Sequence, residues 1–225
     1  PALSPDGRML TFIRGENPFA GAGQIYVKLL PGGDPVQLTS DSAGKMEPRF
    51  SPDGSRIAYT TGFMDTTATL DTWVVPVLGG QPQRLLANAS GLHWINAPGE
   101  PSRVLFSELT GRGAQMSIVT STESRAESRT VYLPASDNGM AHHSYLSPDR
   151  KSVLVVEMES SWMPCRLVAF DGGAPGRPVR PSPAQCPHAA WSPHRARMLF
   201  TAPAGRGPPP PAPPSPPGPP SAGAP

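Results

Sequence analysis

The chain has 225 residues, of which 37% are hydrophobic and 16% charged, and its 19 basic and 17 acidic side chains give a formal net charge of +2. A charge this close to zero does not favour binding to nucleic acid. No apolar run reaches the roughly 18 residues that a membrane-spanning helix needs. Twelve of the 32 prolines lie in residues 203–225, so residues 1–202 hold the material for a folded core. The chain does not begin with Met and shows no signal peptide, and we expect it to be a fragment of a longer protein.

The chain opens on a predicted β-hairpin whose turn has the sequence Ser-Pro-Asp-Gly. Proline presets the backbone for the second position of a turn, aspartate accepts hydrogen bonds from the local backbone, and glycine accepts positive φ. An apolar residue precedes the turn and an alternating strand follows it. We assign a structural role, and not catalysis, to the turn residues of three copies: Ser4, Pro5, Asp6, Gly7, Ser51, Pro52, Asp53, Gly54, Ser147, Pro148 and Asp149.

The turn recurs at an almost constant spacing. Ser4 and Ser51 are 47 residues apart, Ser51 and Ser147 are 96 apart, and Ser147 and Ser192 are 45 apart. The interval of 96 is two periods, and a degenerate copy at residues 94–99 lies midway. This recurrence indicates a repeated structural unit.

A second predicted hairpin, turning at paired glycines, completes most units. Its strands are residues 24–29 and 36–39, then 72–77 and 83–86, then 166–170 and 178–180, and in the third unit, without the glycines, 115–119 and 129–133. Two hairpins give four strands per unit of ~45 residues, which is the size of a β-propeller blade. No segment has the apolar spacing of a helix. A β-sandwich is the alternative all-β fold, but it predicts no fixed recurrence of one turn.

These residues resemble the TolB-like, WD40-like propeller repeat, in which an apolar residue and Ser-Pro-Asp-Gly precede an Ile-Ala-Phe/Tyr strand. Residues 50–60 match throughout, whereas Arg150 replaces the glycine of a later copy and His194-Arg195 replace Asp-Gly in the last. The resemblance implies an all-β fold, an incomplete β-propeller of about four to five four-stranded blades. It favours a periplasmic or other extracytoplasmic location and leaves the cytoplasm open.

We expect blades at residues 1–40, 46–87, 90–134 and 141–182, and a partial blade at 187–202. The chain then supplies the tail of one blade, three fuller blades and a first hairpin, which is too few to close the ring. We therefore expect missing sequence to complete the ring, because an open one leaves unpaired strand edges.

Residues 203–225 are rich in Pro, Ala and Gly and are expected to be disordered or polyproline II. They begin where the last blade needs its second hairpin. The chain also uses 16 Arg against 3 Lys, which suggests GC-rich coding DNA. Two interpretations stay open: a genuine linker, or a frameshift product.

Two pairs of side chains are candidate sites, and we assign a structural role to each pair. Cys165 and Cys186 lack metal-site spacing, and although a disulfide is possible, two free buried thiols are the favoured interpretation. His142 and His143 are neighbours on a predicted inner strand, where alternate side chains point to opposite faces, so a shared metal ion is not expected.

The sequence contains no nucleophile elbow, phosphate-binding loop, zinc-protease motif or kinase catalytic loop. We expect no catalysis, cofactor or metal from this chain, and no nucleic-acid partner. The four tryptophans are expected to wedge between blades. The candidate partner-contact residues lie in two loops: Phe63, Met64, Asp65, Trp162 and Met163.

The expected function is a protein-, peptide- or small-ligand-binding sensor or interaction module of a larger bacterial protein, binding at a rim or in the central channel. Family resemblance adds two alternatives: the regulatory region of a Ser/Thr protein kinase, and the gating propeller of a prolyl-oligopeptidase-type hydrolase.

Overall fold

The structure is a computed structural model, and it describes residues 1–15, 23–62, 70–95, 101–111, 114–158, 163–172, 176–179, 186, 189–192 and 197–200. These residues form strands and turns without a helix, so the predicted all-β class is confirmed. It follows that this part of the chain holds no helix able to cross a membrane. The Pro-rich segment 203–225, for which disorder was expected, lies outside the described residues.

The first two sheets each contain four antiparallel strands in chain order. The first is β1 (Ala2–Leu3), β2 (Met9–Arg14), β3 (Gln24–Leu29) and β4 (Val36–Gln37). The second is β5 (Lys45–Phe50), β6 (Arg56–Thr61), β7 (Asp71–Pro76) and β8 (Gln83–Leu86). The sequence predicted that the first unit is only the last part of a blade, but it contains four strands. The two residues of β1 are enough to pair with β2 and form the first strand.

The next two units have the same order within one larger sheet. Their strands are β9 (Ser90–Trp94), β10 (Arg103–Leu109), β11 (Met116–Thr122), β12 (Arg129–Tyr132), β13 (Met140–Leu146), β14 (Ser152–Met158), β15 (Cys165–Ala169) and β16 (Arg177–Pro178). One parallel bridge, Met116 to Met140, links β11 to β13 and joins the two units. A two-stranded hairpin, β17 (Ala189–Trp191) and β18 (Met198–Phe200), follows.

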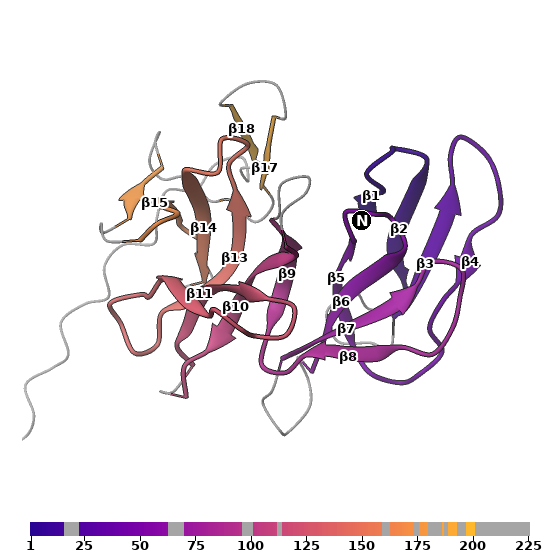
Figure 1. Ribbon diagram of the computed structural model, residues 1–225, viewed down its shortest axis with the longest axis horizontal. Coiled ribbons are helices and arrows are strands. Elements are labelled where there is room, and N and C mark those ends of the chain that lie inside the picture. Colours follow the sequence, from indigo (N-terminus) through magenta and orange to yellow (C-terminus); the bar gives the residue numbers. More distant parts are fainter. Residues whose placement is uncertain are drawn as a thin grey trace, which may run out of the picture.

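The first strand of each unit lies toward the middle of the molecule, and the later strands lie toward its edge (Figure 1). Contacts run between successive first strands, from β1 to β5, β9, β13 and β17. The sheets do not close into a ring. This radial, open arrangement is the incomplete propeller that the repeat predicts.

The Ser-Pro-Asp-Gly turns share one hydrogen-bond pattern. In the second unit the Ser51 hydroxyl donates to Asp53 at 2.5 Å, the amide of Ser55 donates to the same carboxylate at 3.1 Å, and the amide of Arg56 donates to Ser51 Oγ at 3.0 Å. These bonds lower the pKa of Asp53 to about 2. The turns that begin at Ser4 and Ser147 repeat the pattern.

Strand alternation places apolar side chains between neighbouring units. Ile57 and Tyr59 of β6 pack against the first sheet, while Ala58 between them packs against the third unit. Leu105 of β10 packs in turn against Val153 of β14. Burial of each large side chain stabilises the fold by roughly 1.5–3 kcal/mol. The hydrophobic core is therefore a series of layers between units.

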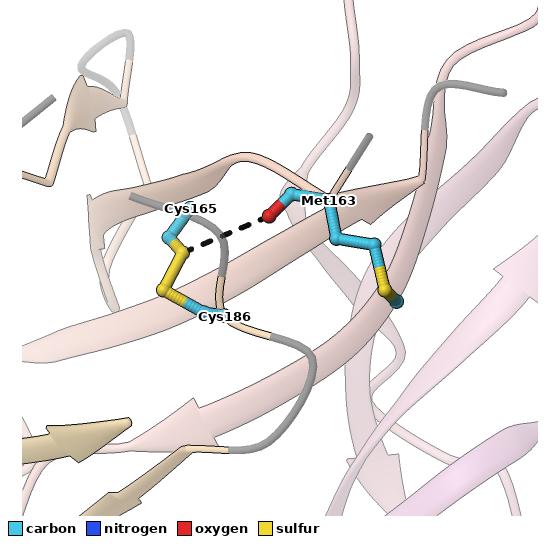
Figure 2. The surroundings of a disulfide bond; sticks show 3 residues. All are labelled: Met163, Cys165 and Cys186. Atoms are coloured by element: carbon cyan, nitrogen blue, oxygen red, sulfur yellow. Dashed lines mark hydrogen bonds between the residues drawn. A yellow bond between two sulfur atoms is a disulfide. The ribbon is translucent and has the colours of Figure 1, made fainter. Parts of the chain in front are cut away.

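Cys165 and Cys186 form a disulfide, so the expectation of two free thiols was wrong. The amide of Cys186 donates to the carbonyl of Met163 at 3.1 Å, which holds Cys186 beside β15, and the Cα atoms of the two cysteines are 6.0 Å apart. Figure 2 shows the sulfur atoms joined next to the Met163 carbonyl. The spacing in sequence gave no sign of this contact, because it depends on how one unit packs on the next.

Candidate functional site on the inner strands

Equivalent positions on three inner strands, β5, β9 and β13, carry polar or aromatic side chains. The reference point is the amide that closes each first hairpin, donated by Ser51, Ile95 and Ser147. The residue two positions before this amide is Arg49 on β5, His93 on β9 and Tyr145 on β13. The residue four positions before it is Glu47, Gly91 and His143 on the same three strands. Because β9 contacts both β5 and β13, these side chains meet near the centre of the arrangement.

A β-bulge changes the direction of the histidine side chains on β13. Its register against β14 shifts between Ala141 and His143, which breaks the normal alternation of faces. The rings of His142 and His143 lie 4.2 Å apart between centroids, and Nδ1 of His142 is 3.0 Å from Nε2 of His143. The expectation that the two side chains point to opposite faces was wrong for this reason. Their expected position on an inner strand is confirmed.

Glu47 reaches across β9 to the same histidine pair. It lies in a bulge of β5 with φ 54°, and its carboxylate contacts Nδ1 of His143. Gly91 lies under this bridge with φ 62°, and a Cβ atom there would be 2.8 Å from Oε2 of Glu47. A larger residue at position 91 would thus displace the Glu47 carboxylate.

Burial and mutual charge set the protonation of this cluster. Burial raises the pKa of Glu47, but the imidazoles of His143, His142 and His93 outweigh it and hold the pKa at about 2. Burial lowers the pKa of His93 to about 3, with a further contribution from Arg49, and lowers that of His142 to about 4. At neutral pH Glu47 is ionised while His93 and His142 are neutral.

Arg49 is the remaining charged side chain of the cluster. It is half-buried, and its guanidinium makes no hydrogen bond or ion pair with the residues that the structure describes. Its charge lowers the pKa of the neighbouring His93. The His93 ring meets that of Tyr145 edge-on, with centroids 5.5 Å apart. The inner strands thus present a cation beside His93, whose ring contacts that of Tyr145.

Within the described ranges, no group of three or more His, Cys, Asp and Glu side chains is arranged to hold a metal ion. Together the side chains offer charge, hydrogen bonding and aromatic surface, which are features of a binding site.

The residues predicted from sequence lie elsewhere. The turn residues close the first hairpins, and Met163 packs beside Leu154, Val156 and the disulfide. Phe63, Met64, Asp65 and Trp162 lie outside the described residues. Sequence reasoning missed Glu47, Arg49, Gly91, His93 and Tyr145. An alignment of the repeated units on their closing turns would have shown that these residues occupy equivalent positions.

No protein-family model matches the chain, and no curated protein sequence matches it. Solved structures do resemble it. A TolB structure from Agrobacterium tumefaciens superposes with a TM-score of 0.66 and 18% identity, covering 89% of this chain and 68% of that one. TolB from Acinetobacter baumannii superposes with a TM-score of 0.61 and 20% identity, covering 83% of this chain and 44% of that one. The apo prolyl oligopeptidase B of Galerina marginata superposes with a TM-score of 0.54 and 12% identity, covering 87% of this chain and 29% of that one.

At these identities the likeness shows the fold. The chain is an incomplete β-propeller. Its fold is that of the TolB-like propellers, as its repeat indicated, and the chain spans about two thirds of one TolB structure and less than half of the other.

Proposed function

We propose that the chain is a non-catalytic binding module of a larger protein, and that its ligand or protein partner is recognised at the inner strands. The observation that carries this proposal is the meeting of Glu47, Arg49, His93 and His143 at the centre of three units, outside the hydrophobic clusters. Half-buried polar groups stabilise a fold less than apolar packing would, so their concentration at one place favours a functional role.

We further propose that the module works outside the cytoplasm. The disulfide between Cys165 and Cys186 supports this, because such bonds persist in oxidising compartments and are rare in the cytosol. The family resemblance favours the same location.

The gating propeller of a prolyl-oligopeptidase-type hydrolase is the second candidate. The likeness to the Galerina marginata enzyme favours it, although the chain covers only 29% of that protein. The kinase alternative has no support from these likenesses. Reading the flanking open reading frame distinguishes the candidates, since a nucleophile elbow downstream would support the peptidase.

Selection of peptides on the purified chain tests the binding function. We expect enriched peptides to lose binding in the variants Glu47→Gln and His93→Gln. They should keep it in Leu78→Ser, a control at a side chain that is 96% exposed after β7. A lack of enrichment, or binding unaffected by the two inner-strand variants, would contradict the proposal. Turnover of a fluorogenic prolyl peptide by the isolated chain would contradict its non-catalytic part.

A further inference from the structure

Arg49 is partly buried and has no hydrogen-bond or ion-pair partner among the residues that the structure describes. A guanidinium that leaves bulk water normally regains its lost hydration through carboxylates, carbonyls or aromatic faces. Three arginines in the interfaces between units regain such contacts: Arg56 bonds to Glu123, Arg125 bonds to Glu108, and Arg129 lies over the Phe170 ring. Arg49 has no such bond to any residue in the described ranges. Its five N–H donors are therefore available to a ligand.

The nearest carboxylate in sequence does not neutralise Arg49, because the backbone turns it away. Glu47 is two residues earlier on β5, a separation that normally puts two side chains on one face of a strand. The bulge and the φ of 54° at Glu47 break that relation. The carboxylate passes over Gly91 and is engaged by His143. Glu47 thus does not act as the counter-ion of Arg49, and no other carboxylate in the described part of the chain does so.

The groups beside Arg49 leave its guanidinium as a donor for an anion, and its charge also lowers the pKa of the α-amino group of Pro1. His93 and Tyr145 occupy the same position on the next two inner strands, and both side chains carry polar atoms as well as aromatic surface. The planar fork of arginine matches a carboxylate in bidentate geometry.

We propose that Arg49 binds the carboxylate group of a ligand, with His93 and Tyr145 beside it on the neighbouring inner strands. This inference rests on the proposed binding function and names the chemistry of that site. The carboxylate can belong to a peptide C-terminus, to an acidic side chain of a peptide, or to a small organic acid.

Titration of the full chain with chemically defined probes tests the proposal. The probes are an acetylated tripeptide with a free C-terminus, its C-terminal amide, the amide of the same peptide carrying one Asp, succinate, and inorganic phosphate. The readouts are calorimetry and the NMR signal of the Arg49 side-chain Nε–H group, which reports on the wild-type protein directly. Binding of the free-acid peptide but neither amide assigns the C-terminus, equal binding of the Asp amide assigns a side chain, and binding of succinate alone assigns a small acid.

Substitutions separate the role of Arg49 from general charge. We expect Arg49→Gln to weaken binding of the carboxylate probe by about tenfold or more, and Arg49→Lys to weaken it less, because a point charge remains but the fork is lost. The matched control is Arg14→Gln, at an exposed arginine near the end of β2, and its affinity should stay within about twofold of wild type.

Three results would overturn the proposal: a carboxylate affinity of Arg49→Gln equal to that of wild type, tighter binding of phosphate than of carboxylate, or an Arg49 Nε–H signal unmoved by every carboxylate probe. Circular dichroism of the variant confirms folding, and the wild-type NMR readout decides the matter if the variant is unfolded. Selected peptides that lose binding in His93→Gln but not in Arg49→Gln would reject the role of Arg49 and leave the binding function standing.

Discussion

Glu47 adopts φ 54°, a left-handed conformation that is unfavourable for a residue with a side chain. The equivalent residue on β9 is Gly91, which adopts φ 62° without a Cβ penalty and leaves room for the Glu47 carboxylate. On β13 the equivalent residue is His143, which contacts that carboxylate. Equivalent positions on the three inner strands thus hold a carboxylate (Glu47), no side chain (Gly91) and an imidazole (His143). These differences allow Glu47 to reach His143.

The lowered pKa values of His93 and His142 predict that the free energy of unfolding falls in acid. The pKa values of His93 (about 3) and His142 (about 4) lie below their usual value of 6.5, so the unfolded chain binds protons that the folded chain does not as the pH falls from about 6.5 to about 4. Glu47, with its pKa lowered from 4.5 to about 2, acts in the same direction at lower pH. Each neutral histidine should steepen the fall by up to about 1.4 kcal/mol per pH unit.

Urea unfolding between about pH 4.5 and pH 7.5 measures this effect. The free energy of unfolding should decline toward acid in the wild type and decline less steeply in His93→Gln. Parallel curves for the two proteins would show that His93 is not buried as a neutral base.

At the scale of strands and hairpins, Glu123 ties the third unit to the second. It follows β11 and accepts hydrogen bonds from Nε1 of Trp94 at 2.7 Å, Oγ of Ser102 at 2.7 Å, and the guanidinium of Arg56 at 3.2 Å. Arg56 also lies over the Trp94 ring, 5.8 Å from its centroid. Trp94 therefore joins neighbouring units through a polar network as well as by packing.

Removing this carboxylate should weaken the interface between the units. Glu123→Ala leaves the Trp94 N–H and the Arg56 guanidinium without their acceptor, and we expect a loss of about 1–3 kcal/mol in the free energy of unfolding. The control is Glu127→Ala, whose 72% exposed side chain pairs with Arg103, and its loss should stay below about 1 kcal/mol. Equal losses in the two variants, measured by urea unfolding, would argue against the network.

The sequence predicts the hairpins well because their turns are local. Serine, aspartate and glycine of the turn bond to backbone within five residues, so the motif specifies its own geometry. The radial fold follows from the repeat of these hairpins. The cluster at the centre was not predicted, because it depends on bulges that carry no clear sequence signal and on contacts such as Glu47 with His143 that are 96 residues apart.

At the scale of the whole molecule, the last described hairpin packs through Ala189, Trp191 and Met198 against the cluster around the disulfide. The disulfide links β15 to Cys186, and Nε1 of Trp191 donates to the carbonyl of Tyr145 at 2.9 Å. The two cysteines are 21 residues apart. A cross-link closing a loop of that size stabilises a fold by roughly 3 kcal/mol in the chain-entropy description.

We therefore expect reductant to lower the thermal midpoint of the wild-type chain. The double variant Cys165→Ser/Cys186→Ser should start from the lower value and not respond to reductant, since the chain has only these two cysteines. Hydrogen exchange should speed up first in β17 and β18. A thermal midpoint insensitive to reductant would mean that the bond does not hold the last hairpin in place.

The central claim is that the inner strands of separate units meet at one axis, and a double-mutant cycle on Glu47 and His143 tests it most directly. These residues lie on β5 and β13 and can interact only if the units are arranged radially around β9. We predict a coupling of at least about 0.5–1 kcal/mol between Glu47→Gln and His143→Gln in the free energy of unfolding at neutral pH. Strictly additive effects of the two substitutions would contradict the account.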